Sequence, residues 1–177
     1  MKTYTNTPFA ALMFDELEDY EVFIEELTEF INLNNSAGAA FNNRAVANWE
    51  IGKVEDALRD FDSAIANLPN NHLPSQNKGM MLHKLGRLKE AIESLNLAVE
   101  IREDLATLRR TRAHILIDAG MLEEALKDFE IAIKIDPSFQ NTKIERDNLI
   151  GRIRSMSSNI QISGKSFINT KTLQGGH

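Results

Sequence analysis

The sequence predicts an all-α fold, a right-handed α-solenoid of stacked helix–turn–helix units with capping helices at both ends. Three stretches of similar sequence follow one another at a fixed interval of 34 residues, as Gly52, Gly86 and Gly120 show. Apolar residues inside each stretch recur every three or four positions, which is the spacing of one helical face. The glycine lies between two such faces, where a chain that leaves one helix for another needs a tight turn.

Small residues keep the same interval and indicate how the helices pair. Ala45, Gly79 and Ala113 lie on the first helices of the three units. The second helices carry an alanine, a large apolar residue and another alanine: Ala57, Phe61 and Ala64; Ala91, Leu95 and Ala98; Ala125, Phe129 and Ala132. Two helices approach closely where side chains are small, and the larger residue then fills the gap toward the next unit.

These residues resemble the tetratricopeptide repeat, a 34-residue helix–turn–helix unit with glycine, alanine, an aromatic residue, alanine and proline at these intervals. The resemblance covers residues 38–71, 72–105 and 106–139 without insertion. It implies a solenoid whose first helices line a concave groove. Members of the family generally hold a peptide or a partner helix in that groove.

The flanking segments are predicted to close the stack. Residues 1–37 are interpreted as an acidic cap with a degenerate repeat, because Leu27 lies 34 residues before Phe61. Residues 140–156 are expected to form a closing helix, since each interior unit buries its face against a neighbour. Residues 157–177 are expected to be a flexible tail. Ile160 and Ile162 alternate with polar residues as in an extended segment, so an alternative is that the tail forms a hairpin or occupies the groove.

Composition narrows the class of protein. The content of 42% apolar and 26% charged residues is ordinary for a globular chain. The net charge of −6 argues against a nucleic-acid-binding protein, and the absence of cysteine excludes disulfides and suits a reducing compartment. The apolar run at residues 9–14 is too short for an export signal, and nothing approaches a membrane span. A cytoplasmic protein without a membrane partner is expected.

No residues are predicted to carry catalysis or to hold a cofactor or a metal. Gly164, Lys165 and Ser166 resemble the end of a phosphate-binding loop, but Asn159 stands where that loop needs its first glycine. His83 and His114 belong to successive first helices, and we interpret them as part of a polar wall rather than as metal ligands. The protein is therefore not expected to be an enzyme.

The resemblance instead assigns a peptide-binding groove to the first helices. Its predicted residues are Asn42, Asn43, Trp49, Gln76, Asn77, Met80, His83, Lys84, Arg110, Thr111 and His114. Asparagine suits this role because its amide both donates to and accepts from a peptide backbone. Trp49 is either an apolar anchor or a packing residue, and the sequence leaves both open. The second helices are expected to expose Arg59, Asp60, Glu93, Lys127 and Asp128 to solvent.

One variant of the family groove grips a C-terminal carboxylate with lysine, asparagine and arginine at set positions. Asn43 fits one of the five positions, whereas Pro8, Leu12, Leu73 and Asn77 do not. The sequence therefore predicts a non-enzymatic adaptor or scaffold that binds a peptide or helix segment of a protein partner by other contacts. The alternative is a structural module that self-assembles through its caps or tail. A monomer or weak homo-oligomer is expected.

Overall fold

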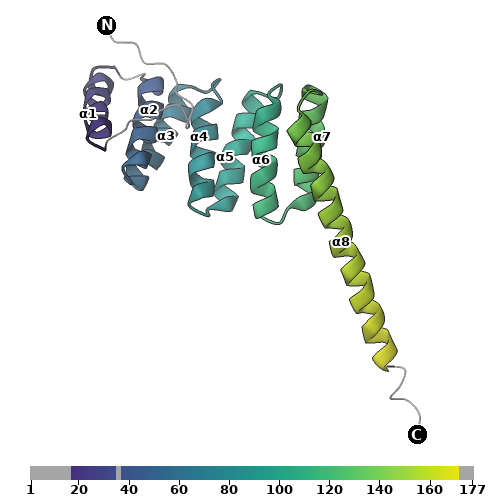
Figure 1. Ribbon diagram of the computed structural model, residues 1–177. Coiled ribbons are helices and arrows are strands. Elements are labelled where there is room, and N and C mark those ends of the chain that lie inside the picture. Colours follow the sequence, from purple (N-terminus) through teal and green to yellow (C-terminus); the bar gives the residue numbers. More distant parts are fainter. Residues whose placement is uncertain (1–16, 35–36, 172–177) are drawn as a thin grey trace.

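The computed structural model describes residues 17–34 and 37–171, with side chains described up to Ser158. All regular structure in these ranges is helical, which confirms the predicted fold class (Figure 1). The helices are α1 (Leu17–Leu33), α2 (Gly38–Glu50), α3 (Val54–Asn67), α4 (Leu73–Lys84), α5 (Leu88–Ile101), α6 (Ala106–Asp118), α7 (Leu122–Ile135) and α8 (Gln140–Lys171).

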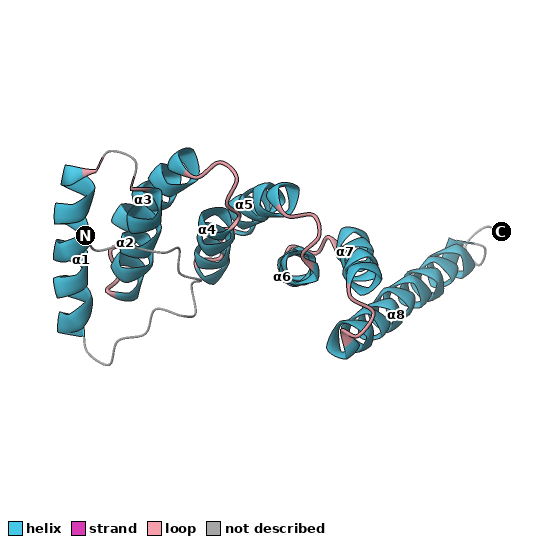
Figure 2. Cartoon of the chain, turned by 90° about the horizontal axis from the view of Figure 1, so that it is seen from above, coloured by secondary structure: helices cyan, strands magenta, loops and turns pink. Residues whose placement is uncertain are grey.

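The helices stand side by side from α1 to α7 and form a stack rather than a globule (Figure 1). Three antiparallel pairs, α2 with α3, α4 with α5 and α6 with α7, repeat along it. Seen from above, α2, α4 and α6 lie on one side of the stack, and α3, α5 and α7 lie on the other (Figure 2). We call α2, α4 and α6 the first helices and α3, α5 and α7 the second helices.

The turn inside each pair depends on a glycine in the left-handed conformation. Gly52, Gly86 and Gly120 have φ angles of 79°, 73° and 77°. The next backbone N–H reaches back into the first helix, as from Arg87 to the carbonyl of Leu82 at 2.9 Å. Glycine is favoured here because a Cβ would oppose this backbone conformation, so the sequence interval places the turns.

The core runs along the stack between the helices. Phe61, Leu95 and Phe129 of the second helices are fully buried, and so are the alanines on either side of each. Gly79 shows how close one pair comes, since a Cβ there would lie 2.9 Å from Leu95 Cγ and 3.1 Å from the Ala91 carbonyl oxygen. Leu27 of α1 is also fully buried, in a cluster with residues of α2.

Helix α8 departs from the expectation of a helix that ends near residue 156. It continues unbroken to Lys171 and leaves the stack, so residues 157–171 are neither extended nor placed in the groove (Figure 1). The reason lies at the next position of the 34-residue glycine series, which is Arg154. The turn that ends the other first helices would force this arginine into the left-handed conformation, at a cost in backbone strain. Residues 172–177 lie outside the described residues.

Candidate functional site

The first helices contact one another through side chains that lie 35 residues apart. Asn77 Nδ2 donates to Asn42 Oδ1 over 3.0 Å, which links α4 to α2. His83 Nε2 lies 2.7 Å from Asp118 Oδ2, which links α4 to α6. Three first helices thus form a continuous wall, which we call the first-helix face.

The start of α8 extends the first-helix face by one more helix. Arg110 Nε donates to Glu145 Oε2 over 2.7 Å, and Arg110 Nη2 donates to Glu145 Oε1 over 2.5 Å. His114 Nε2 lies 3.5 Å from the same Oε1 atom. Because this link again spans 35 residues, α8 begins in the register of a first helix.

The surroundings of Arg110 fix its charge and its orientation. Its guanidinium carbon lies 5.5 Å from the centroid of the Phe139 ring, and its fork faces Glu145. The hydrogen bonds from Arg110 hold the pKa of the Glu145 carboxyl below its ordinary value. His114 packs edge-on against Phe129, with ring centroids 5.6 Å apart. Both members of the ion pair therefore stay charged at neutral pH, on a surface that solvent reaches.

The predicted groove residues are divided between the interior and the surface. Asn42, Asn43 and Asn77 are 0%, 4% and 1% exposed, so the asparagines lie between helices and not along an open groove. Asn42 and Asn77 are hydrogen-bonded to each other, and Asn42 also donates to Asn43 Oδ1 over 3.1 Å. Their position indicates that they hold neighbouring first helices together.

The other predicted residues reach solvent to differing degrees. Lys84 and His114 are exposed. Trp49, Gln76, Met80, His83, Arg110 and Thr111 are half-buried. Trp49 and Met80 pack beside the core cluster that contains Phe61, and Thr111 donates to its own helix at the Thr107 carbonyl. The surface of the first-helix face is therefore apolar beside Met80 and ionic beside Arg110.

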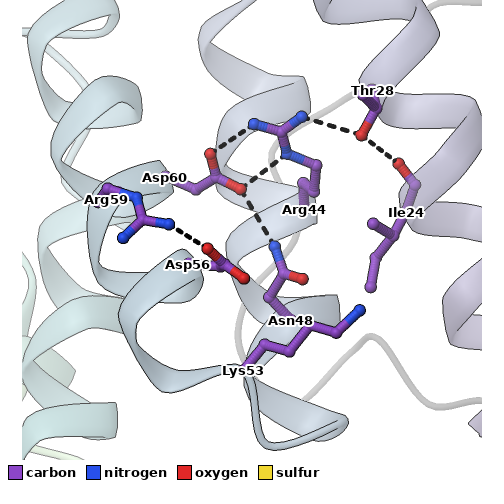
Figure 3. A pocket seen from close by; sticks show the side chains of 8 residues that line it. All are labelled: Ile24, Thr28, Arg44, Asn48, Lys53, Asp56, Arg59 and Asp60. Carbon is purple, nitrogen blue, oxygen red and sulfur yellow. Dashed lines mark hydrogen bonds and ion pairs between the residues drawn. The ribbon is translucent and has the colours of Figure 1, made fainter.

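The expectation that Asp60 and Asp128 face solvent is wrong. Asp60 is 6% exposed, and Arg44 donates two hydrogen bonds to its carboxylate. The distances are 2.8 Å from Nε to Oδ2 and 2.7 Å from Nη2 to Oδ1. Arg44 Nη1 also donates to Thr28 of the preceding helix over 2.9 Å (Figure 3). The charge of Arg44, which is half-buried beside α3, draws the carboxylate inward.

The third unit repeats this arrangement. Asp128 is 3% exposed, and Arg112 contacts it through Nε and Nη2, both at 2.7 Å. Arg112 Nη1 donates to Asn96 over 2.9 Å, as Arg44 does to Thr28. The second unit has Lys78 and Ser94 at the matching positions, and Lys78 pairs with Asp62 of the preceding helix at 2.5 Å.

A cavity of about 300 Å³ adjoins the first of these ion pairs, between α1, α2 and α3 (Figure 3). Its polar lining includes Arg44, Asn48, Lys53 and Asp60. All three guanidinium nitrogens of Arg44 already donate to protein oxygens. The cavity is therefore a weaker candidate for a binding site than the first-helix face.

Sequence reasoning missed Glu145 as part of this face. The signal was available, because the interval that joins Asn42 to Asn77 also joins Arg110 to Glu145. His83 and His114 meet different carboxylates, and the described residues contain no group of three side chains placed to hold a metal. None of the helices within these residues has the length and apolar character that crossing a bilayer requires.

The fold and the periodic wall define a helical-repeat solenoid. Residues 75–105 and 111–139 match the model of the tetratricopeptide repeat. The small glutamine-rich tetratricopeptide repeat-containing protein 2 of Saccharomyces cerevisiae is 29% identical over 90 residues, which is 51% of this chain and 26% of that protein. The Hsp70-Hsp90 organising protein of Plasmodium falciparum is 38% identical over 56 residues, or 32% of this chain and 22% of that protein. This chain thus matches only about a quarter of each relative's length.

Solved structures show the same fold. YrrB, a TPR protein with an unusual peptide-binding site, superposes with a TM-score of 0.64 at 22% identity, over 78% of this chain and 71% of YrrB. The first TPR of Spaghetti (RPAP3), bound to the HSP90 peptide SRMEEVD, gives 0.59 at 19% identity, over 66% of this chain and 93% of that one. Residues 75–139 of the chain thus contain tetratricopeptide repeats, and the described helices have the solenoid fold that the sequence predicted.

Proposed function

We propose that the protein is a non-enzymatic adaptor that binds a segment of a partner protein along the first-helix face. The observation that carries the proposal is the continuity of this face across α2, α4, α6 and the start of α8. A continuous wall offers one surface to a ligand that several repeats contact together. Two similar structures support a binding function, since YrrB is described as having a peptide-binding site and the first TPR of Spaghetti (RPAP3) as bound to a peptide.

The surface suits a segment of mixed chemistry. Met80 offers an apolar contact, Gln76 offers an amide, and Arg110 and His114 offer donors. Gln76, Met80 and Arg110 are half-buried, so their side chains are partly held in place before a ligand arrives. Fixed side chains lose less conformational entropy on binding than mobile ones, which favours recognition here.

Selection from a random peptide library tests the proposal. Peptides selected on the full chain are expected to bind a His114→Ala or Gln76→Ala variant about tenfold more weakly, as for the main contacts of an interface. Glu93→Ala is the control, because Glu93 is exposed on the second-helix side. Circular dichroism would verify that the variants fold. Equal binding to all variants, or failure to select any peptide, would count against a binding function on this face.

A second candidate is self-assembly through α8. Ile144 and Met156 are 53% and 50% exposed on this helix. A second copy of the chain could bury such apolar side chains, which removes their surface from water. Light scattering should then show a mass that rises with protein concentration and falls back to the monomer in Met156→Glu. A constant monomer mass would rule out self-assembly and leave the adaptor function as the remaining proposal.

A further inference from the structure

Arg110 differs from the other arginines that form a fork between helices. Arg44 and Arg112 use all three guanidinium nitrogens within the protein, and their side chains are 19% and 18% exposed. Arg110 uses Nε and Nη2 for Glu145, its Nη1 has no acceptor among the described residues, and its side chain is 32% exposed. It is therefore the arginine of this group that keeps a donor for a ligand.

The charge along the stack favours an acidic ligand at this end. Helix α1 contains six acidic residues and no basic one. Helix α6 contains Arg109, Arg110 and Arg112 with a single acid. Arg109 and Arg112 face the buried Asp128, which leaves Arg110 and His114 as the basic groups of α6 on the first-helix face. An acidic side chain is thus disfavoured near α1 and favoured beside α6.

Glu145 already supplies the carboxylate that Arg110 and His114 would recognise. It accepts the arginine fork and lies beside the histidine, as a ligand carboxylate would. Its side chain is 24% exposed and belongs to α8, so water reaches the pair. A ligand carboxylate in the same place would accept the same two hydrogen bonds from Arg110, so the exchange replaces the bonds that it breaks.

We propose that Glu145 occupies the position of an acidic side chain of the bound segment, and that the segment binds Arg110 and His114 by displacing it. This inference rests on the proposed function and names the ligand chemistry and the internal competitor. The competitor weakens binding of every acidic segment. Only a segment with further contacts along the first-helix face then displaces it.

Fluorescence anisotropy with a fluorescein-labelled hexaglutamate peptide tests the proposal. The peptide carries an amide at its C-terminus, so that a free terminal carboxylate plays no part. We expect Glu145→Gln in the full chain to bind it about fivefold more tightly than wild type, which corresponds to about 1 kcal/mol for the loss of a half-buried competing charge. Adding Arg110→Gln to this variant should remove the gain.

Glu93→Gln is the matched control, because it changes the net charge equally on the other side of the stack. It should bind within about twofold of wild type, as a distant charge is screened at ordinary ionic strength. Equal gains in Glu93→Gln and Glu145→Gln, tight binding that survives Arg110→Gln, or no binding to Glu145→Gln would each overturn the inference.

The two proposals fail in different ways. If library peptides bind the first-helix face but hexaglutamate does not bind Glu145→Gln, the acidic ligand is wrong and the adaptor function stands. If neither the library nor hexaglutamate yields a ligand, the binding function itself is wrong.

Discussion

Equivalent positions in successive repeats carry ion pairs that differ in how deeply the carboxylate is buried. Arg44 and Lys78 occupy the same position in successive units, yet Arg44 faces a carboxylate with an 8% exposed side chain and Lys78 faces one that is 63% exposed. Replacement of Arg44 by methionine leaves the Asp60 carboxylate buried with Asn48 as its remaining partner. The stability of the fold should depend on the first pair far more than on the second.

We predict that Arg44→Met lowers the free energy of unfolding by about 3 kcal/mol, the cost of leaving a buried charge without its partner. Lys78→Met is the control, with the same new side chain and the same change in net charge. It should cost less than about 1 kcal/mol, because its pair is exposed. Urea unfolding of both variants measures the difference, and equal costs would show that burial of Asp60 is not decisive.

A second residue-scale prediction concerns buried hydroxyl groups. Thr142 is fully buried, and its Oγ1 has no hydrogen-bond partner within the described part of the chain. Leu108 occupies the same position one unit earlier. Thr142→Val should therefore raise the free energy of unfolding by about 1 kcal/mol, since the unpaired hydroxyl is removed at constant shape.

Ser75→Ala provides the opposite case. Ser75 is also fully buried, but its hydroxyl donates to the His72 carbonyl over 2.9 Å. Its removal should lower stability by about 1 kcal/mol. Thermal melts of the two variants should shift in opposite directions. A loss of stability in Thr142→Val would mean that its hydroxyl has a partner in solution.

At the scale of helices, glycine acts in two ways that one substitution separates. Gly86 has a φ of 73°, and a Cβ there would meet nothing within 4 Å. Gly86→Ala should therefore cost about 1–2 kcal/mol from backbone strain alone. Gly151 lies inside α8 with equally open space. Gly151→Ala should stabilise the helix by about 0.5–1 kcal/mol. Urea unfolding that gave both changes the same sign would contradict the role assigned to the turns.

The sequence was sufficient for the helix pairs, because glycine, alanine and the larger apolar residues recur at one interval. It was not sufficient for α8, since composition suggested a loose tail and the decisive residue is Arg154, at the place of an absent glycine. The site was only partly predictable. A helical period places Asn42 and Asn77 on a face, but how deep they lie depends on how closely neighbouring first helices approach.

At the scale of the whole molecule, the stack and α8 make the protein elongated (Figure 1). Helix α8 has 32 residues, which corresponds to a length of about 48 Å. A compact chain of 177 residues would have a radius of gyration of about 16 Å. Small-angle X-ray scattering should give a value well above this, with a forward intensity that reports the monomer mass. A monomer with a radius of gyration near 16 Å would mean that α8 folds back onto the stack in solution.

The regular spacing of the first helices also sets a length scale for whatever binds across them. Packed helix axes lie about 8–10 Å apart, and an extended peptide advances about 3.3 Å per residue. An extended peptide that crosses one such spacing therefore advances by about three residues. A segment that places an apolar side chain against Met80 should carry its acidic side chain for Arg110 at least about three positions away. The protein would then recognise a spacing between residues as well as the residues themselves.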